Sequence, residues 1–189
     1  MNAIKTTSAL IGASLIATGI AFATAPAAQA GQVAGKLPMS AAGVALLDAT
    51  KDVTKIRTDA INLRAQVQAL LQGYLDKYGD RFNSSELAQL KALQTNADRQ
   101  MVGVIAAINT LRTAIAQKKS ASAVAKAKTA AITAWSNAKK NAEASWTTAR
   151  GIMEPKLSLF EKLGPLNDYN AMMDQFDALG AAISSLKTK

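Results

Sequence analysis

The sequence predicts an all-α fold: an antiparallel bundle of three long helices plus a shorter C-terminal helix, following a cleaved signal peptide. Hydrophobic residues make up 49% of the 189 residues but aromatic residues only 5%, so the apolar content is mainly small and aliphatic. Alanine has the highest intrinsic helix propensity, which favours helices. Apolar residues also recur at steps of three and four through most of the chain, as they do on one face of a helix.

Residues 1–30 have the pattern of an export signal. Lys5 is the positive start, residues 9–23 are apolar, and Ala28-Gln29-Ala30 has the small-x-small pattern of a cleavage site. The alternative is an uncleaved membrane anchor, but the apolar stretch is shorter than the roughly 20 residues that a spanning helix needs. We therefore expect cleavage before Gly31 and a periplasmic or secreted mature protein.

The first mature helix has the most regular pattern in the chain. After a leading segment, residues 31–39, the bundle domain covers residues 40–189, and Ser40 can cap a helix that ends near Tyr78. Its apolar residues alternate steps of three and four over four heptads, which is typical of a coiled-coil seam. These residues are Leu46, Ala49, Val53, Ile56, Ala60, Leu63, Val67, Leu70 and Tyr74. The seam can hold the bundle together, and residues 46–74 are also a candidate homo-oligomer interface.

The second helix is expected from Ser84 or Ser85 to about Lys118. The segment that follows, residues 118–122, has neither glycine nor proline. It is either a turn, capped by Ser120 or Ser122, or part of one continuous rod on the order of 120 Å long. Because compact domains favour antiparallel neighbours, we expect the turn.

The third helix is expected from about Ser122 to Leu163, and a shorter fourth helix from about 166 to 186. Pro155 should kink the third helix, because proline lacks the N–H that the preceding turn requires. Gly164-Pro165 should end it, because both residues are common at helix C-termini.

The net charge of +9 is concentrated in one part of the chain. No acidic residue lies between Asp98 and Glu143. Once Lys5 is removed with the signal peptide, the part of the mature chain outside this interval has no net charge. The basic residues of this interval are Arg99, Arg112, Lys118, Lys119, Lys126, Lys128, Lys139 and Lys140. In an antiparallel pair of helices they would form a basic pole, residues 99–142, that attracts an anionic partner: a lipid headgroup, an acidic polysaccharide or extracellular nucleic acid. The alternative is that these side chains only solvate an alanine-rich helix pair.

Two tryptophans form a second candidate surface. Trp135 and Trp146 are eleven residues apart, about three helical turns, so they share a face. That face could contact a client protein or a bilayer, although tryptophan on a helix seam is more often part of the core.

The residues that the chain lacks exclude several classes of activity. It has no cysteine and no histidine. Thiol nucleophiles and disulfides are therefore absent, and so are the commonest base near neutral pH and the commonest imidazole metal ligand. No phosphate-binding loop, nucleophile elbow or calcium loop occurs either. We therefore predict no catalytic residue, metal site, cofactor or small-molecule substrate.

These observations together predict a non-enzymatic exported protein that binds or assembles at the cell envelope or in the extracellular matrix, with the basic pole for an anionic partner. Two alternatives stay open. One is a periplasmic holdase chaperone that uses the tryptophan face. The other is a self-assembling surface or filament subunit that uses the heptad seam.

Overall fold

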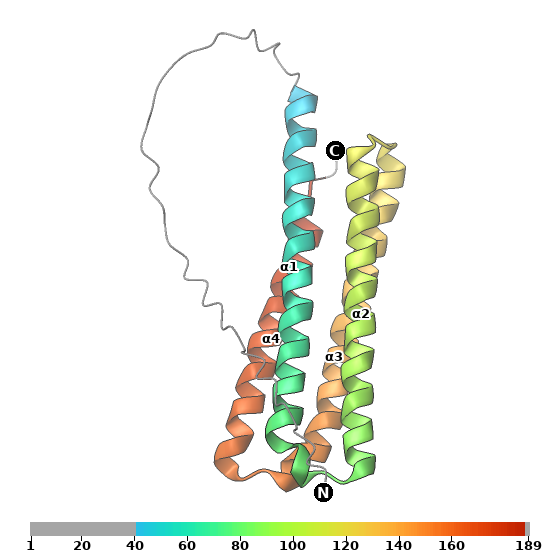
Figure 1. Ribbon diagram of the computed structural model, residues 1–189. Coiled ribbons are helices and arrows are strands. Elements are labelled where there is room, and N and C mark those ends of the chain that lie inside the picture. The colour runs from blue at the N-terminus through green and yellow to red at the C-terminus, as the bar shows by residue number, and fades with distance from the viewer. Residues whose placement is uncertain (1–40, 188–189) are drawn as a thin grey trace, which may run out of the picture. The chain divides into compact units, whose positions relative to one another are not determined.

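The computed structural model describes residues 41–187, and their side chains from residue 49 onward. Its long helices are α1 (Ala41–Tyr78), α2 (Ser84–Ala116), α3 (Ala121–Met153) and α4 (Leu159–Ser185), with short 3₁₀ turns η1 (Gly79–Arg81) and η2 (Glu154–Lys156). Figure 1 shows successive helices running in opposite directions, with the α2–α3 turn at one end of the bundle and η1 and η2 at the other. The all-helical prediction is confirmed for the described range. The predicted signal peptide and leading segment lie outside it.

The α2–α3 connection is a turn, so the prediction of a turn rather than a rod is confirmed. Helix α2 ends at Ala116, and Lys118 adopts a left-handed conformation with φ of 52°. The N–H groups of Lys118 and Lys119 then donate to the carbonyls of Ile115 and Ala114, both at 3.0 Å. The hydroxyl of Ser120 accepts the N–H of Ala123 at 3.3 Å and so caps α3. A left-handed lysine costs on the order of 1 kcal/mol, which these hydrogen bonds offset.

The predicted boundary between the third and fourth helices is wrong. Helix α3 ends at Met153 rather than Leu163, because the chain turns into η2 around Pro155 instead of kinking and continuing. Gly164 and Pro165, expected to end the third helix, both lie inside α4, and Pro165 is buried there.

A capping box explains why α4 begins early. The hydroxyl of Ser158 accepts the N–H of Glu161, and the Glu161 carboxylate accepts the N–H of Ser158 at 2.8 Å. These two hydrogen bonds satisfy donors that the helix start would otherwise leave free. Pro165 lies in the second turn, where its missing N–H removes one hydrogen bond and leaves the rest of the helix intact.

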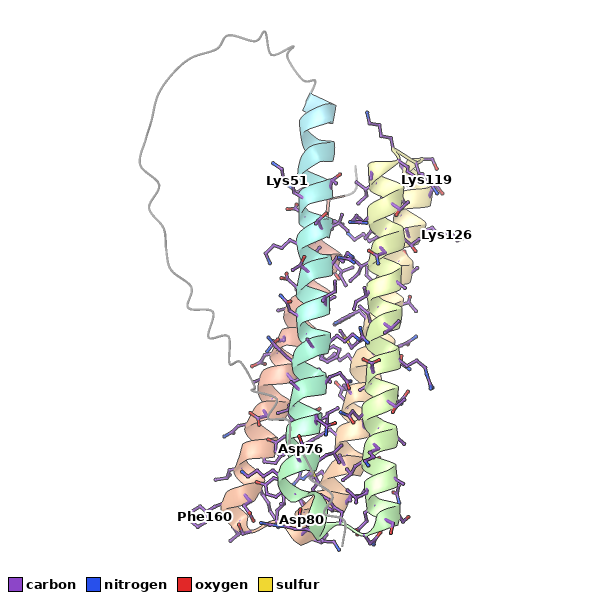
Figure 2. The ribbon with its side chains drawn as sticks, in the orientation of Figure 1. Lys51, Asp76, Asp80, Lys119, Lys126 and Phe160 are labelled. Carbon is purple, nitrogen blue, oxygen red and sulfur yellow. The ribbon has the colours of Figure 1, made fainter. Side chains whose placement is uncertain are left out.

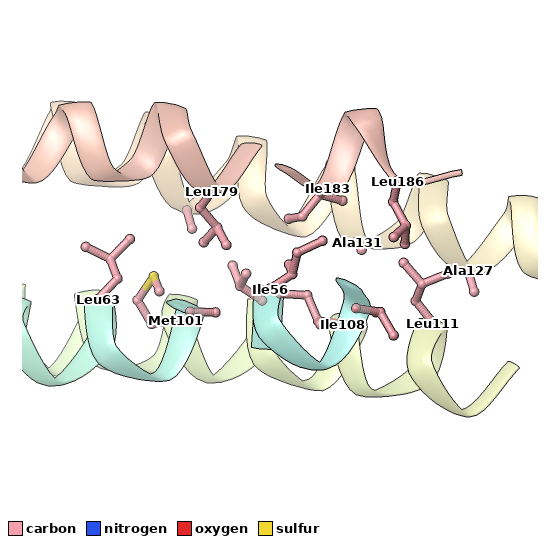
Figure 3. Packing of buried hydrophobic residues seen from close by; sticks show 14 of the residues in the cluster. Ile56, Leu63, Met101, Ile108, Leu111, Ala127, Ala131, Leu179, Ile183 and Leu186 are labelled. Atoms are coloured by element: carbon pink, nitrogen blue, oxygen red, sulfur yellow. The ribbon is translucent and has the colours of Figure 1, made fainter. Parts of the chain in front are cut away.

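The main core lies in the half of the bundle nearer the α2–α3 turn. Val53, Val104, Ile108, Ala131 and Ile183, from all four helices, are fully buried. Figure 3 shows aliphatic side chains of α1, α2 and α4 meeting small alanines of α3. The seam residues from Ala49 to Val67 are buried in this cluster, whereas Leu70 and Tyr74 are half-buried. The seam therefore packs within the chain.

A second, smaller cluster lies near η1 and η2. It consists of Tyr78, Phe82, Leu90, Ala149, Met153 and Leu157. Between the two clusters is a partly open apolar cavity of about 90 Å³, lined from all four helices. If such a void is empty, it reduces stability by about 2 kcal/mol at roughly 24 cal/mol per Å³.

Candidate anion-binding pole

Three exposed lysines gather at the α2–α3 turn. Lys118 and Lys119 lie in the turn itself, and Lys126 is one to two turns into α3. Figure 2 shows Lys119 and Lys126 at this end of the bundle, whereas Asp76 and Asp80 are at the opposite end. Within the described part of the chain, no acidic side chain forms an ion pair with any of the three. We call these three residues the basic turn.

A shallow groove between α2 and α3 adjoins the basic turn. It has a volume of about 380 Å³, and Lys119, Lys126, Asn109 and Thr113 are among its lining residues. Asn109 is held in place by Arg57, whose Nε donates to the Asn109 Oδ1 at 2.7 Å. Because that bond occupies the amide oxygen, the Asn109 NH₂ group is left as a donor. The groove thus offers two ammonium groups and an amide donor, a combination suited to phosphate, sulfate or carboxylate.

The helix dipoles contribute little to this site. The positive N-terminus of α3 and the negative C-terminus of α2 meet at the same turn, so their partial charges largely cancel. The positive potential of the turn therefore comes from its lysine side chains.

Two of the predicted basic residues have structural contacts instead. The Lys128 Nζ donates to the carbonyls of Ser184 and Leu186, at 2.7 and 2.8 Å, and so caps the C-terminus of α4. Lys139 pairs with Asp177 of α4, and this hydrogen bond raises the pKa of the Lys139 ammonium. Both cations join α3 to α4, so we do not place them in the anion site.

The other three predicted basic residues lie away from the turn or are less exposed. Arg99 and Lys140 are exposed near the middle of α2 and α3, roughly 30 Å from the turn along the helices. Arg112 is half-buried and lies on α2 between Arg99 and the turn. The structure thus divides the predicted pole into the basic turn, two cross-helix contacts and a more distant group. Lys187, missed by the sequence analysis, is exposed directly after Leu186, to whose carbonyl Lys128 binds.

The two predicted contact tryptophans lie between α3 and α4, both half-buried. The Trp135 indole Nε1 donates to the Phe176 carbonyl at 2.7 Å, and its ring lies over Gly180. Trp146 stacks on Tyr169, with ring centroids 4.6 Å apart. Each ring therefore helps to attach α4 to the bundle.

A different apolar surface was missed by the sequence analysis. Leu159, Phe160, Leu163 and Leu166 are exposed on the first two turns of α4, with Phe160 88% exposed. The spacing of these residues is a helical face, but the predicted helix boundary at Gly164 divided the pattern. This surface lies near η2, at the opposite end from the basic turn.

Comparisons with known proteins add no assignment. The chain matches no protein-family model, no curated protein and no solved structure. Between residues 41 and 187, no helix is long and apolar enough to cross a membrane.

Proposed function

We propose that this is an exported, non-enzymatic protein that docks on an anionic surface or polymer at the cell envelope or in the extracellular matrix. The docking site is the basic turn of Lys118, Lys119 and Lys126, with the adjoining α2–α3 groove. The observation that carries this proposal is that the three lysines are exposed, adjacent and free of acidic partners within the described residues.

The expected interaction is weak and sensitive to salt. A lysine near an anionic membrane surface contributes about 1 kcal/mol, so three contribute about 3 kcal/mol, or roughly a hundredfold in affinity. Exposed charges are screened over about 10 Å at 0.1 M salt, so this gain falls as salt rises. A surface or polymer with many anionic groups would add further contacts through Lys187 or Arg112.

The packing of the other candidate surfaces favours docking over the two alternatives. A filament built through the α1 seam would first have to open the bundle, because the seam residues from Ala49 to Val67 are buried. A holdase that used Trp135 and Trp146 would have to release α4, because both rings lie against it. The basic turn is available without any such rearrangement.

Co-sedimentation with vesicles tests the proposal. Wild-type protein is mixed with anionic or neutral vesicles at low and high salt, and parallel binding assays use an acidic polysaccharide and double-stranded DNA. The proposal expects binding to at least one polyanion, loss of that binding at high salt, and at least tenfold weaker binding by the triple variant Lys118→Gln, Lys119→Gln, Lys126→Gln.

A matched control separates the basic turn from net charge. The triple variant Lys77→Gln, Lys91→Gln, Lys162→Gln removes the same charge from the opposite end of the bundle. It should retain nearly wild-type binding. Equal losses in the two triple variants would mean that only net charge matters, and absence of binding to all three polyanions would overturn the proposal.

A further inference from the structure

The apolar cavity between the two core clusters has no charged side chain in its lining. Leu70, Leu93, Trp146 and Met172 represent the four helices that surround it, and almost all of its surface is hydrocarbon, aromatic or thioether. Groups of this kind bind apolar molecules and offer nothing to compensate the desolvation of an ion.

Short side chains on α3 create this space. Ala138, Ala142, Ser145 and Ala149 line the cavity from α3, at a level where the other helices contribute leucines, methionines and aromatic residues. Ala138 and Ala149 are themselves buried, so this space lies inside the bundle. At the cavity the space is left unfilled.

Three of the polar side chains in the lining, Tyr74, Asn141 and Ser145, have hydrogen-bond partners inside the protein. Asn141 Oδ1 accepts hydrogen bonds from Asn96 Nδ2 at 3.1 Å and from Ser145 Oγ at 3.4 Å. The Tyr74 hydroxyl donates to Asp168, which joins α1 to α4. Because most of the lining surface is apolar and these three side chains are already hydrogen-bonded, the cavity favours an apolar occupant over water.

The size of the cavity limits that occupant. Its volume of about 90 Å³ is several times the roughly 10–15 Å³ that one water needs, and smaller than the roughly 150 Å³ engineered cavity known to bind benzene. It accommodates a few carbon atoms, as in a very small hydrocarbon or the end of an alkyl chain. The lining contains three methionines, Met101, Met153 and Met172. Their flexible and polarizable side chains can adapt to a small hydrocarbon or to the end of an alkyl chain.

The start of α4 extends this apolar character to the outside of the bundle. Pro165 and Tyr169 line the cavity, and Leu166 lies one turn before Tyr169 and is 39% exposed. Leu163 lies one turn before Leu166 and is 55% exposed, because residues three apart are neighbours on a helix surface. An alkyl chain longer than the cavity would therefore have an apolar surface for its remaining carbons on the same helix.

We propose that the cavity between the four helices is a binding site for hydrocarbon, taking a small free molecule or the end of an alkyl chain. The site is separate from the basic turn, so its occupant and the anionic partner bind at different places on the bundle.

Methionine NMR on the full chain tests this inference. With ¹³C-methyl-labelled methionine, the protein is titrated with cyclopropane, which has only three carbon atoms, and, separately, with decanoate below its micelle concentration. The signals of Met101, Met153 and Met172 should shift with saturation, and Met173, which is not in the lining, should not. Shifts with either compound, together with a rise in Tm, support the site. No shift of the three signals with both compounds overturns it.

A cavity-filling variant separates binding in the cavity from binding at the surface. Ala142→Leu should keep or raise Tm without ligand and weaken binding at least tenfold, whereas Ala144→Leu on the exposed face of α3 should bind as wild type does. If Ala142→Leu does not fold, Ala149→Val fills the same cavity with fewer atoms. Unchanged binding by a folded filling variant would overturn the inference.

Substitutions on the outer face of α4 distinguish the two possible occupants, an alkyl chain and a small free hydrocarbon. Binding of decanoate that Leu163→Ser with Leu166→Ser weakens supports an alkyl chain, because these residues would contact its outer part. Binding of cyclopropane that the same two substitutions leave unchanged supports a small free hydrocarbon in the cavity alone.

Discussion

The two ends of the bundle use their charged residues differently. At the basic turn, Lys118, Lys119 and Lys126 are exposed and form no ion pair within the described residues. At the opposite end, which we call the clamped end, cations join elements across the fold. Arg81 of η1 binds both carboxylate oxygens of Glu161, at 2.8 and 3.0 Å. Lys156 of η2 lies 3.4 Å from Glu86 of α2.

The difference follows from how each connection is held. The turn between α2 and α3 is closed by backbone hydrogen bonds and by the Ser120 cap, so its lysine side chains are not needed for structure. At the clamped end the chain must attach η1, η2 and the start of α4 to one another, and side-chain pairs provide part of that attachment. Charged side chains are therefore available to a partner where backbone hydrogen bonds and an uncharged cap already hold the connection.

The largest expected effect comes from the core nearer the basic turn. Ile108→Ala removes a fully buried side chain and should lower the free energy of unfolding by about 2–5 kcal/mol. Val102→Ala, at a 45% exposed position of the same helix, should change it by less than about 1 kcal/mol. Urea denaturation of both variants measures the difference. Equal effects would mean that α2 packs through a different face.

The next effect concerns the contact between α3 and α4. A Cβ at Gly180 would lie 2.2 Å from the Trp135 ring, so Gly180→Ala should destabilise the bundle by about 1–3 kcal/mol through overpacking. Gly103 is also helical but has open space around it, so Gly103→Ala should instead stabilise by about 0.5–1 kcal/mol. Thermal unfolding of the two variants provides the comparison. Stabilisation by both changes would contradict the position of Trp135.

A smaller effect tests the clamped end directly. Ser158→Ala removes the cap of α4 and should lower stability by about 1 kcal/mol, as should Ser120→Ala at the α3 cap. Ser158→Ala should also shorten α4, which amide hydrogen exchange would detect as lost protection from Lys162 onward. Unchanged protection and stability would favour a helix that begins only after Pro165.

The smallest effect is the pH dependence of the clamped end. The hydrogen bonds from Arg81, and then from the Ser158 N–H, lower the pKa of Glu161 from about 4.5 to about 2. Because the folded pKa is the lower one, Glu161 contributes stability above about pH 4.5, and this contribution is lost as the pH falls towards 2. Wild type should therefore be more stable than Glu161→Gln at neutral pH, and the difference should shrink in acid.

The control for this measurement is Glu143→Gln. Its carboxylate is exposed on α3 and forms no ion pair among the described residues. The stability difference between this variant and wild type should be small at every pH. A pH-independent difference for Glu161→Gln would contradict the ion pair with Arg81.

Features encoded by nearby residues could be read from the sequence. The heptad pattern of α1 predicted its buried face, and serines placed the turn before α3, because periodicity and capping act within a few residues. The absence of acidic residues between Asp98 and Glu143 likewise follows from the chain alone. The boundary before α4 was missed because Gly164-Pro165 was interpreted as the end of the third helix and the Ser158 capping box was not considered, although a proline in an early turn removes only one hydrogen bond.

By itself, the sequence determined that the chain forms helices, where the α2–α3 turn lies and which part of the chain carries the positive charge. Only the tertiary structure decided which lysines remain free. Lys128 meets the end of α4 across 56 and 58 residues of sequence, and Lys139 meets Asp177 across 38. The cavity also depends on the packing of all four helices. Local propensity acts over a few residues, whereas such contacts depend on how distant segments pack, and that is why packing alone separates the basic turn from the cations that hold the bundle together.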